Sequence, residues 1–378
     1  MKRLHGTILL WLSGKQCFTL KGKKKYWNFN KRFRNLRMGQ LLSHPIEEKF
    51  IDEHQRNAFT YCVGLMQGYR MSMEDAFSVS VGNGEQVSVF GVFDGHGGRG
   101  CAEYISEHMT KFVYEELEKL IFNPERGLTD YMNVVRDSFF KMDHDIPAQI
   151  SANSGSTAIL ATIIAKRYVI IANTGDSRCI MSLDGEPKAM SFDHKTTTMG
   201  ERLRIENSGG YIVNGRVNEV LALSRAVGDS RFKSQFIRTT RNNASYVTKK
   251  KAETNKNAIR IPPEIFQVTV EPDILVYDLL ALQEPEFIVL ACDGVWECYT
   301  SSQIVDRVRE KISQNWKLET IVEYILDDCI SMANKITGIG FDNMTLIIIA
   351  VHSDSDINSW YGMMKERIAT KQGRKTSS

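Results

Sequence analysis

The chain has 378 residues, of which 42% are hydrophobic and 25% charged, as expected for a globular protein with a sizeable core. Its seven cysteines are odd in number and form no C-x-x-C pair, which argues against a disulfide framework or a zinc site and indicates reduced thiols that mostly fill the core. The net charge of +3 is uneven: residues 1–37 hold 11 Lys/Arg and no acid, and the rest has 37 basic against 45 acidic residues, which argues against nucleic acid as the main partner.

Residues 1–59 are predicted to be a basic N-terminal extension, of which residues 1–37 have three open interpretations: a targeting leader, a disordered arm or an upstream gene-model extension. Met38 opens the stretch MGQLLS, which fits the myristoylation pattern with Gly39 as acceptor if translation starts at Met38. A mitochondrial leader fits less well, because serine and arginine are scarce. We expect no membrane span, since no run of about 18 apolar residues occurs, but a myristoyl chain gives reversible membrane attachment.

Apolar runs of strand length follow one another from about Tyr61. Turn signals such as Gly82-Asn83-Gly84 and Asp184-Gly185 separate neighbouring runs, and turns this short join strands antiparallel. The predicted strands are Phe77–Val81, Val87–Phe93, Thr157–Ala165, Tyr168–Ala172, Cys179–Leu183, Phe287–Ala291 and Thr345–Val351.

Helical periodicity marks the segments between these groups of strands. The predicted helices are Tyr104–Leu120, Tyr131–Met142, Met199–Asn207, Ser301–Ile312 and Leu318–Met332. Hairpins interrupted by pairs of helices indicate an α+β domain of antiparallel sheets, and not the regular β-α-β alternation of a dinucleotide-binding fold.

The predicted domain covers residues 60–352 and contains one segment of different character. Residues 231–261 hold nine Lys/Arg against one acid and show no periodicity, so we predict a basic surface insertion, either a solvated loop or a docking element for an acidic partner. Residues 353–378 are predicted to be a polar, frayed tail.

Gly95, Gly97 and Gly100 fit the G-x-G-x-x-G spacing of a dinucleotide-binding turn. Asp94 and His96 lie inside this stretch, and an aspartate there would repel the pyrophosphate that a helix N-terminus attracts. The same stretch can therefore be interpreted as a nucleotide loop or as part of a metal site.

Carboxylates follow or precede several predicted strands, next to glycine or small polar residues. They are Glu74-Asp75 after Arg70, Asp94, Asp293 after FIVLAC, and Asp342 before NMTLIII. Acids converging at one sheet edge repel one another unless a cation neutralises them, and oxygen ligands select Mg²⁺ or Mn²⁺ over zinc. The four charges of Glu74, Asp94, Asp293 and Asp342 match two divalent ions, a centre suited to hydrolysis at phosphorus.

Eight segments carry a family resemblance over roughly Ala58–His352. They are GYRMSMEDA, VFGVFDGHGG, SGSTAILATII, IANTGDSR, DHK, SGGYIVNGRVNEVLALSRAVGD, IVLACDGVWE and GFDNMT. In this order they resemble the metal-dependent Ser/Thr phosphatases of the protein phosphatase 2C family, fungal members in particular. The resemblance implies two antiparallel β-sheets flanked by antiparallel helices, with two Mg²⁺ or Mn²⁺ ions at one edge of the sandwich.

The resemblance also implies a ligand set. Asp94 bridges both ions, Asp75 acts through water, and Asp176 lies near a third, weaker ion. The other implied ligands are Glu74 and the carbonyl of Gly95 on one ion, and Asp293 and Asp342 on the other.

The implied reaction is the hydrolysis of phosphoserine and phosphothreonine in proteins by direct attack of a metal-bridging hydroxide. Arg70 holds the substrate phosphate through paired hydrogen bonds, and His96 is the general acid that protonates the leaving alkoxide. The expected protein is a monomer in the cytoplasm or nucleus that acts on phosphorylated proteins.

Two other classes of function compete with this interpretation. A pseudophosphatase would lack a ligand carboxylate, and none is missing here, although Thr196, Glu219 and Glu297 depart from the family pattern. A nucleotide-dependent oxidoreductase rests on the glycine spacing alone.

Overall fold

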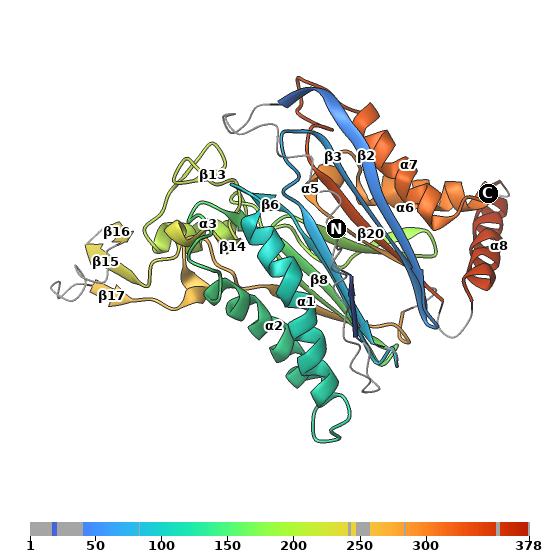
Figure 1. Cartoon of the computed structure of the whole chain (residues 1–378), viewed down its shortest axis with the longest axis horizontal. Coiled ribbons are helices and arrows are strands. Elements are labelled where there is room, and N and C mark those ends of the chain that lie inside the picture. Colours follow the sequence, from blue (N-terminus) through green and yellow to red (C-terminus); the bar gives the residue numbers. More distant parts are fainter. Residues whose placement is uncertain are drawn as a thin grey trace, which may run out of the picture.

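Two six-stranded antiparallel sheets lie at the centre of the molecule (Figure 1). The computed structural model describes residues 17–20, 41–82, 84–240, 243–246, 258–282, 285–352 and 356–376. The first sheet has the strand order β1 (Cys17–Leu20), β4 (Ala76–Gly82), β5 (Val87–Phe93), β8 (Ala158–Ile164), β9 (Tyr168–Thr174) and β18 (Asp273–Asp278). The second has the order β11 (Glu186–Ala189), β10 (Arg178–Leu183), β19 (Pro285–Ala291), β20 (Met344–Val351), β3 (Phe59–Arg70) and β2 (Leu41–Gln55).

The apolar runs are continuous because both faces of each central strand are covered. In β5, Phe90 and Val92 pack into the core between the two sheets, whereas Val89 and Phe93 pack against the helices on the other face of the first sheet. Successive side chains of a strand point to opposite faces, so a strand between two apolar layers needs apolar residues at every position.

Helices cover the outer face of each sheet (Figure 1). α1 (Gly100–Leu120) and α2 (Leu128–His144) pack on the first sheet, and α6 (Ser301–Ser313), α7 (Leu318–Ser331) and α8 (Ile357–Thr376) lie on the side of the second. The predicted class, an α+β sandwich with antiparallel sheets and flanking helices, is confirmed.

Short elements complete the fold at the ends of the sheets. A small sheet of β14 (Val227–Gly228), β7 (Gly155–Ser156) and β6 (Gly95–His96) lies beyond the end of β5, and the hairpin of β12 (Ile212–Val213) and β13 (Arg216–Val217) follows α3 (Met199–Asn207). α5 (Asp293–Trp296), η2 (Ser230–Phe232) and η3 (Pro263–Ile265) are single turns.

The basic insertion predicted at residues 231–261 includes a small sheet. Its described part forms β15 (Phe236–Thr240), β16 (Asn243–Tyr246) and β17 (Ala258–Arg260), which pair antiparallel and project beyond α3 (Figure 1). Ile237, Ile261 and Phe266 form a small apolar cluster beneath these strands, and such a cluster explains why a segment without clear periodicity still forms a sheet.

Both predicted boundaries of the domain differ from the structure. The predicted N-terminal extension over residues 1–59 is wrong for residues 41–55, which form β2 and pair antiparallel with β3. The prediction of a frayed tail over 353–378 is wrong for α8, whose Trp360 is only 1% exposed and donates from Nε1 to the carbonyl of Glu286 at 2.9 Å. Met38 and Gly39 lie outside the described residues.

The helices give no sign of a membrane-spanning segment. None of those in the described part of the chain combines the length and the apolar character needed to cross a bilayer.

The burial of Trp360 makes α8 a structural part of the domain, which can be tested by mutation. We expect Trp360→Ala to lower the free energy of unfolding by about 3–5 kcal/mol, because it leaves a large cavity under the second sheet. Phe122→Ala is the matched control, since this aromatic side chain is 68% exposed. Urea unfolding followed by circular dichroism measures both, and equal, small losses would show that α8 does not stabilise the domain.

Candidate metal centre

The predicted ligands meet because their strands end at one rim of the sandwich. Asp293 lies two residues after the end of β19, and Asp342 lies two residues before the start of β20. These strands are antiparallel neighbours. Asp75 precedes β4 and Asp94 follows β5, and the pairing of Ala76 with Phe93 places these two acids side by side. The antiparallel register thus brings together residues that are more than 200 positions apart in the sequence.

Asn343 joins the two sheets at this rim. Its Nδ2 donates to the carbonyls of Gln67 at 2.8 Å and Ser72 at 3.0 Å, and its Oδ1 accepts from the backbone N–H of Glu74 at 2.9 Å. Because residues 71–75 cross from β3 in the second sheet to β4 in the first, these bonds fix the position from which Glu74 and Asp75 project.

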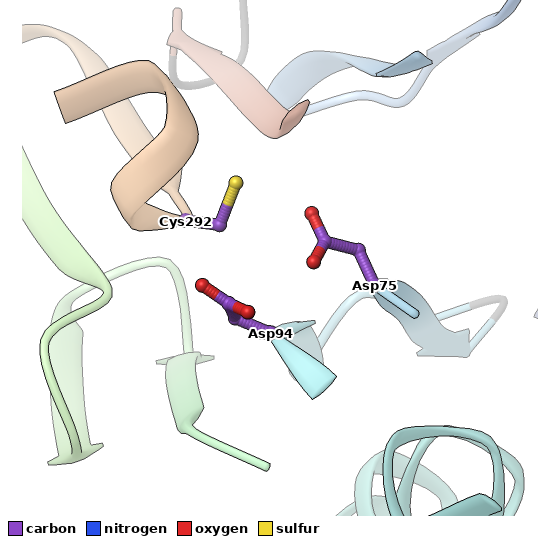
Figure 2. A group of neighbouring side chains, drawn as sticks. All are labelled: Asp75, Asp94 and Cys292. Carbon is purple, nitrogen blue, oxygen red and sulfur yellow. The ribbon is translucent and has the colours of Figure 1, made fainter. Parts of the chain in front are cut away.

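Asp75, Asp94 and Cys292 point toward one another (Figure 2). One oxygen or sulfur atom of each lies within 4.8 Å of the other two. Asp75 Oδ2 accepts from the hydroxyl of Thr345 at 2.8 Å, and Cys292 Sγ accepts from the backbone N–H of Thr345 at 3.1 Å. Cys292 is buried, which agrees with the expectation that the cysteines mostly fill the core. Thr345 orients the side chains of Asp75 and Cys292.

The rim carboxylates raise one another's pKa. Burial, followed by the charges of Asp293, Asp75, Asp342 and Asp176, raises the pKa of Asp94 well above its ordinary value. Burial and neighbouring acids likewise raise the pKa of Asp75 and of Asp176 to about 7 and that of Asp342 to about 6. These shifts are the expected result of buried like charges, and a bound cation would reverse them.

Two glycines allow the backbone segments that carry the acids to lie close together. A Cβ on Gly95 would overlap the carbonyl oxygen of Glu74, and a Cβ on Gly294 would overlap the carbonyl oxygen of Asn343. The first close approach keeps the backbone after Asp94 against the segment that carries Glu74. The second keeps the start of α5, with Asp293, against the segment that carries Asp342.

Arg70 and Glu74 occupy the border of the site. The Arg70 guanidinium forms an ion pair with Asp342 and is also attracted by Asp293 and Asp94. The Glu74 carboxylate accepts from Ser72 Oγ at 2.9 Å and from the backbone N–H of Gly98 at 3.1 Å. The structure therefore places both at the rim, but Asp75 lies in the tight group with Asp94.

Asp176 lies in the turn between β9 and β10, at the same end of the sandwich. Its pKa is raised mainly by burial and then by the charges of Asp293 and Asp193. Asp193 accepts two hydrogen bonds from Arg178, at 2.9 and 2.8 Å. Asp176 is thus close to the other acids, as expected for a residue near a further, weaker ion.

His96 has a partner, Asp229, whose role the sequence motifs did not indicate. Its Nε2 lies 2.6 Å from Oδ2 of Asp229, which is 1% exposed at its side chain. Burial lowers the pKa of His96, but the hydrogen bond and charge of Asp229 outweigh burial, so the pKa is raised overall. Asp229 follows a glycine at a strand end, the same signal that marked Asp94.

Contacts with neighbouring segments fix the positions of His96 and Asp229. A Cβ on Gly155, the strand partner of His96, would collide with the side chains of both residues. Asp143 of α2 accepts from the backbone N–H of Gly228 at 2.8 Å and pairs with Lys233. These contacts fix the backbone on either side of Asp229.

The nucleotide interpretation of the glycine spacing does not fit this arrangement. Gly95 belongs to β6, α1 begins at Gly100, and β5 lies in an antiparallel sheet. A dinucleotide-binding turn requires a parallel βαβ unit. The donor set suits a hard divalent cation instead, because most of its donors are carboxylate and carbonyl oxygens, and the raised pKa values of the carboxyl groups report negative charge that lacks compensation.

The comparisons with known proteins agree with the geometry. A family model described as protein phosphatase 2C matches residues 59–337. The chain is 35% identical to protein phosphatase 2C homolog 4 of Saccharomyces cerevisiae, over 89% of this chain and 100% of that protein. It is also 35% identical to protein phosphatase 2C homolog 3 of Schizosaccharomyces pombe, over 89% of this chain and 75% of that protein.

Solved structures share the fold. A phosphatase from Toxoplasma gondii superposes with a TM-score of 0.62 at 24% identity, covering 82% of this chain and 97% of that one. A serine-threonine phosphatase 2C from the same organism gives a TM-score of 0.61 at 19% identity, covering 81% and 99%.

The raised pKa values at the rim predict how stability depends on pH without metal. A carboxyl whose folded pKa exceeds its unfolded pKa stabilises the fold at low pH and loses that contribution as the pH rises through the folded value. We therefore expect the Tm of the protein in EDTA to be several degrees higher at about pH 6 than at about pH 8, since each pKa unit corresponds to about 1.4 kcal/mol.

Differential scanning fluorimetry measures this effect. Added Mn²⁺ should raise the Tm most at the higher pH, where the carboxylates are charged. Asp94→Asn should raise the Tm in EDTA at the higher pH and weaken the response to Mn²⁺. A metal-free Tm that stays constant across this pH range would contradict the assigned repulsion.

Proposed function

The chain belongs to the protein phosphatase 2C family, and we propose that it is a metal-dependent phosphatase that hydrolyses phosphoserine and phosphothreonine in proteins. The observation that carries this proposal is the rim at which Asp94, Asp293 and Asp342 meet beside the Arg70 guanidinium. An acidic cluster beside a guanidinium suits a phosphate monoester only when divalent cations supply further positive charge.

The residues at the rim fit two ions, Mg²⁺ or Mn²⁺. Asp94 lies at the centre of the acids and would contact both ions; the remaining ligands would be Glu74, the Gly95 carbonyl, Asp293 and Asp342, with Asp75 acting through water and Asp176 near a third ion. When bound, the ions supply positive charge that lowers the pKa of water and neutralises the phosphate oxygens.

Arg70 would bind and orient the phosphate. Its guanidinium already faces the rim through the ion pair with Asp342, and its side chain is 49% exposed. A planar guanidinium can donate two parallel hydrogen bonds to two phosphate oxygens. Arg70 would therefore hold the phosphate at the rim and set its orientation.

His96 would hold the proton that the leaving alkoxide needs. Its raised pKa favours the doubly protonated ring near neutral pH. With Nε2–H donating to Asp229, Nδ1–H is the donor to the departing oxygen, and Asp229 stabilises the charged ring that gives up the proton. Asp229 is thus a positioning residue for His96.

Other expectations from the sequence go with this proposal. We propose phosphorylated proteins as substrates, a monomeric enzyme, and a place in the cytoplasm or nucleus. Reversible membrane attachment through myristoyl-Gly39 stays a prediction.

Removing a single rim carboxylate tests the function. We expect Asp94→Asn and Asp342→Asn each to reduce Mn²⁺-dependent hydrolysis of a phosphothreonine peptide by at least about 10²-fold, because the ions lose a charged ligand. Asp137→Asn on α2 is the matched control, since this side chain is 70% exposed. Circular dichroism checks folding, and near-normal turnover of the rim variants would refute the assignment.

The role of His96 predicts a dependence on the leaving group. We expect His96→Ala to lower kcat for a phosphoserine peptide by about 10²–10⁴-fold, the usual range for a general acid. The loss should be much smaller for an aryl phosphate, whose leaving group needs little protonation.

Asp229→Asn should show the same dependence on the leaving group with a smaller loss, because it keeps the side-chain volume but removes the charge that stabilises protonated His96. Equal losses on both substrates would rule out the proton-donor role.

A further inference from the structure

One of the cysteines with a described side chain differs from the others in exposure. Cys298 is partly exposed, whereas Cys62, Cys101, Cys179, Cys292 and Cys329 are buried. Peroxide reacts with the thiolate of accessible cysteines and leaves buried thiols largely intact. Among these six, Cys298 is therefore the cysteine that an oxidant can reach first.

Cys298 also lies next to a second thiol. It follows α5, and Cys329 lies in the last turn of α7, which packs against α5. Cys298 Sγ lies 3.8 Å from the carbonyl oxygen of Cys329, and the two side chains influence each other's pKa. The chain thus brings a partly exposed thiol and a buried partner together from positions that are 31 residues apart.

The surroundings of Cys298 favour its thiolate. The interaction with the Cys329 side chain, followed by the backbone of Gly340, lowers the pKa of the Cys298 thiol and outweighs burial and the charges of Glu297 and Asp328. By contrast, burial raises the pKa of Cys62, Cys101 and Cys179.

Cys298 and Cys329 contact the segments that carry two of the predicted metal ligands, Asp293 and Asp342. Cys298 Sγ donates to the carbonyl of Gly294 at 3.5 Å, and Gly294 follows Asp293 at the start of α5. A Cβ on Gly340 would collide with the backbone around Cys329 and Ala333, and Gly340 precedes Asp342 by two residues. A change in the bonding of the two sulfurs would therefore shift the segments that carry Asp293 and Asp342.

We propose that Cys298 and Cys329 are a peroxide-sensitive dithiol whose oxidation to an intramolecular disulfide lowers the activity of the enzyme. Hydrogen peroxide is the oxidant. The Cys298 thiolate attacks it, an S–O bond forms, the O–O bond breaks, and hydroxide leaves with Cys298 oxidised to the sulfenic acid. Cys329 then attacks this sulfur, the S–S bond forms and the S–O bond breaks, and the hydroxide that leaves takes the Cys329 proton, so two waters form overall.

The loss of activity follows from geometry and rests on the proposed function. In the disulfide, Cys298 Sγ can no longer donate to Gly294, and the end of α5 is tied to α7. Both changes displace α5 relative to the segment of Asp342. Displacements of about 1 Å near reacting groups can cost about 10²-fold in rate, so we expect the oxidised enzyme to be at least about tenfold less active.

The test treats the full-length protein with hydrogen peroxide in EDTA, removes the oxidant with catalase, and then divides the sample. Peptide mass spectrometry after alkylation without reduction should find Cys298 linked to Cys329. The second half is assayed with Mn²⁺ on an aryl phosphate, and dithiothreitol should restore the lost activity.

Variants assign the roles of the two sulfurs. Cys298→Ala should leave Cys329 reduced and the activity insensitive to peroxide. Cys329→Ala should stop at the sulfenic acid of Cys298, which dimedone traps. Cys62→Ala is the matched control, because Cys62 is a buried thiol of β3, and it should behave like the wild type.

The outcomes separate the parts of the proposal. Fully alkylated Cys298 after peroxide, or a disulfide that joins it to another cysteine such as Cys17, would overturn the dithiol. A disulfide with unchanged activity would overturn the regulatory part. An untreated enzyme without phosphatase activity would instead contradict the proposed function, and the mass measurement would still decide whether the dithiol forms.

Discussion

The mutual repulsion of buried carboxylates at one rim is the constraint on which the rest of this structure depends. Asp75, Asp94, Asp176 and Asp342 all have raised pKa values because each is partly or fully removed from water and faces other acids. Such an arrangement costs free energy of folding unless positive charge compensates it. Arg70 supplies one such charge, and bound divalent cations would supply more, so the acids that weaken the metal-free fold are the ones that would hold the ions.

The sandwich bears this cost because the acids are held by backbone geometry. Asp94 lies at a point where its own N–H donates to Thr157 Oγ1 at 3.1 Å and its carbonyl accepts from the Thr157 N–H at 2.9 Å. Asn343 holds the crossing between the sheets in the same way, with three hydrogen bonds. These bonds fix the backbone from which the acids project, and a site whose ligands are positioned in advance needs little reorganisation to bind ions.

Backbone contacts also position the residues that we propose for catalysis and for its regulation. The pair of His96 and Asp229 is fixed by Gly155 and by the contact between Asp143 and Gly228, so the proposed proton donor is positioned by α2 and two short strands. Cys298 and Cys329 lie next to α5, which begins with Asp293. Proton delivery and ion binding are therefore supported by different parts of the chain.

The sequence by itself determined the class of fold, the core strands, several helices and the acids of the site. α3 spans the predicted residues 199–207, and α6 and α7 end within one residue of their predicted limits; α6 and α7 each bury an apolar stripe, whereas α3 buries only Glu201 and Ile205. Only the tertiary structure decided that residues 41–55 pair as β2, that α8 docks through Trp360, that Asp229 holds His96 and that Cys298 meets Cys329. These features depend on contacts between segments far apart in the chain, and local composition carries no record of which distant partner covers a polar strand, an isolated tryptophan or a single thiol.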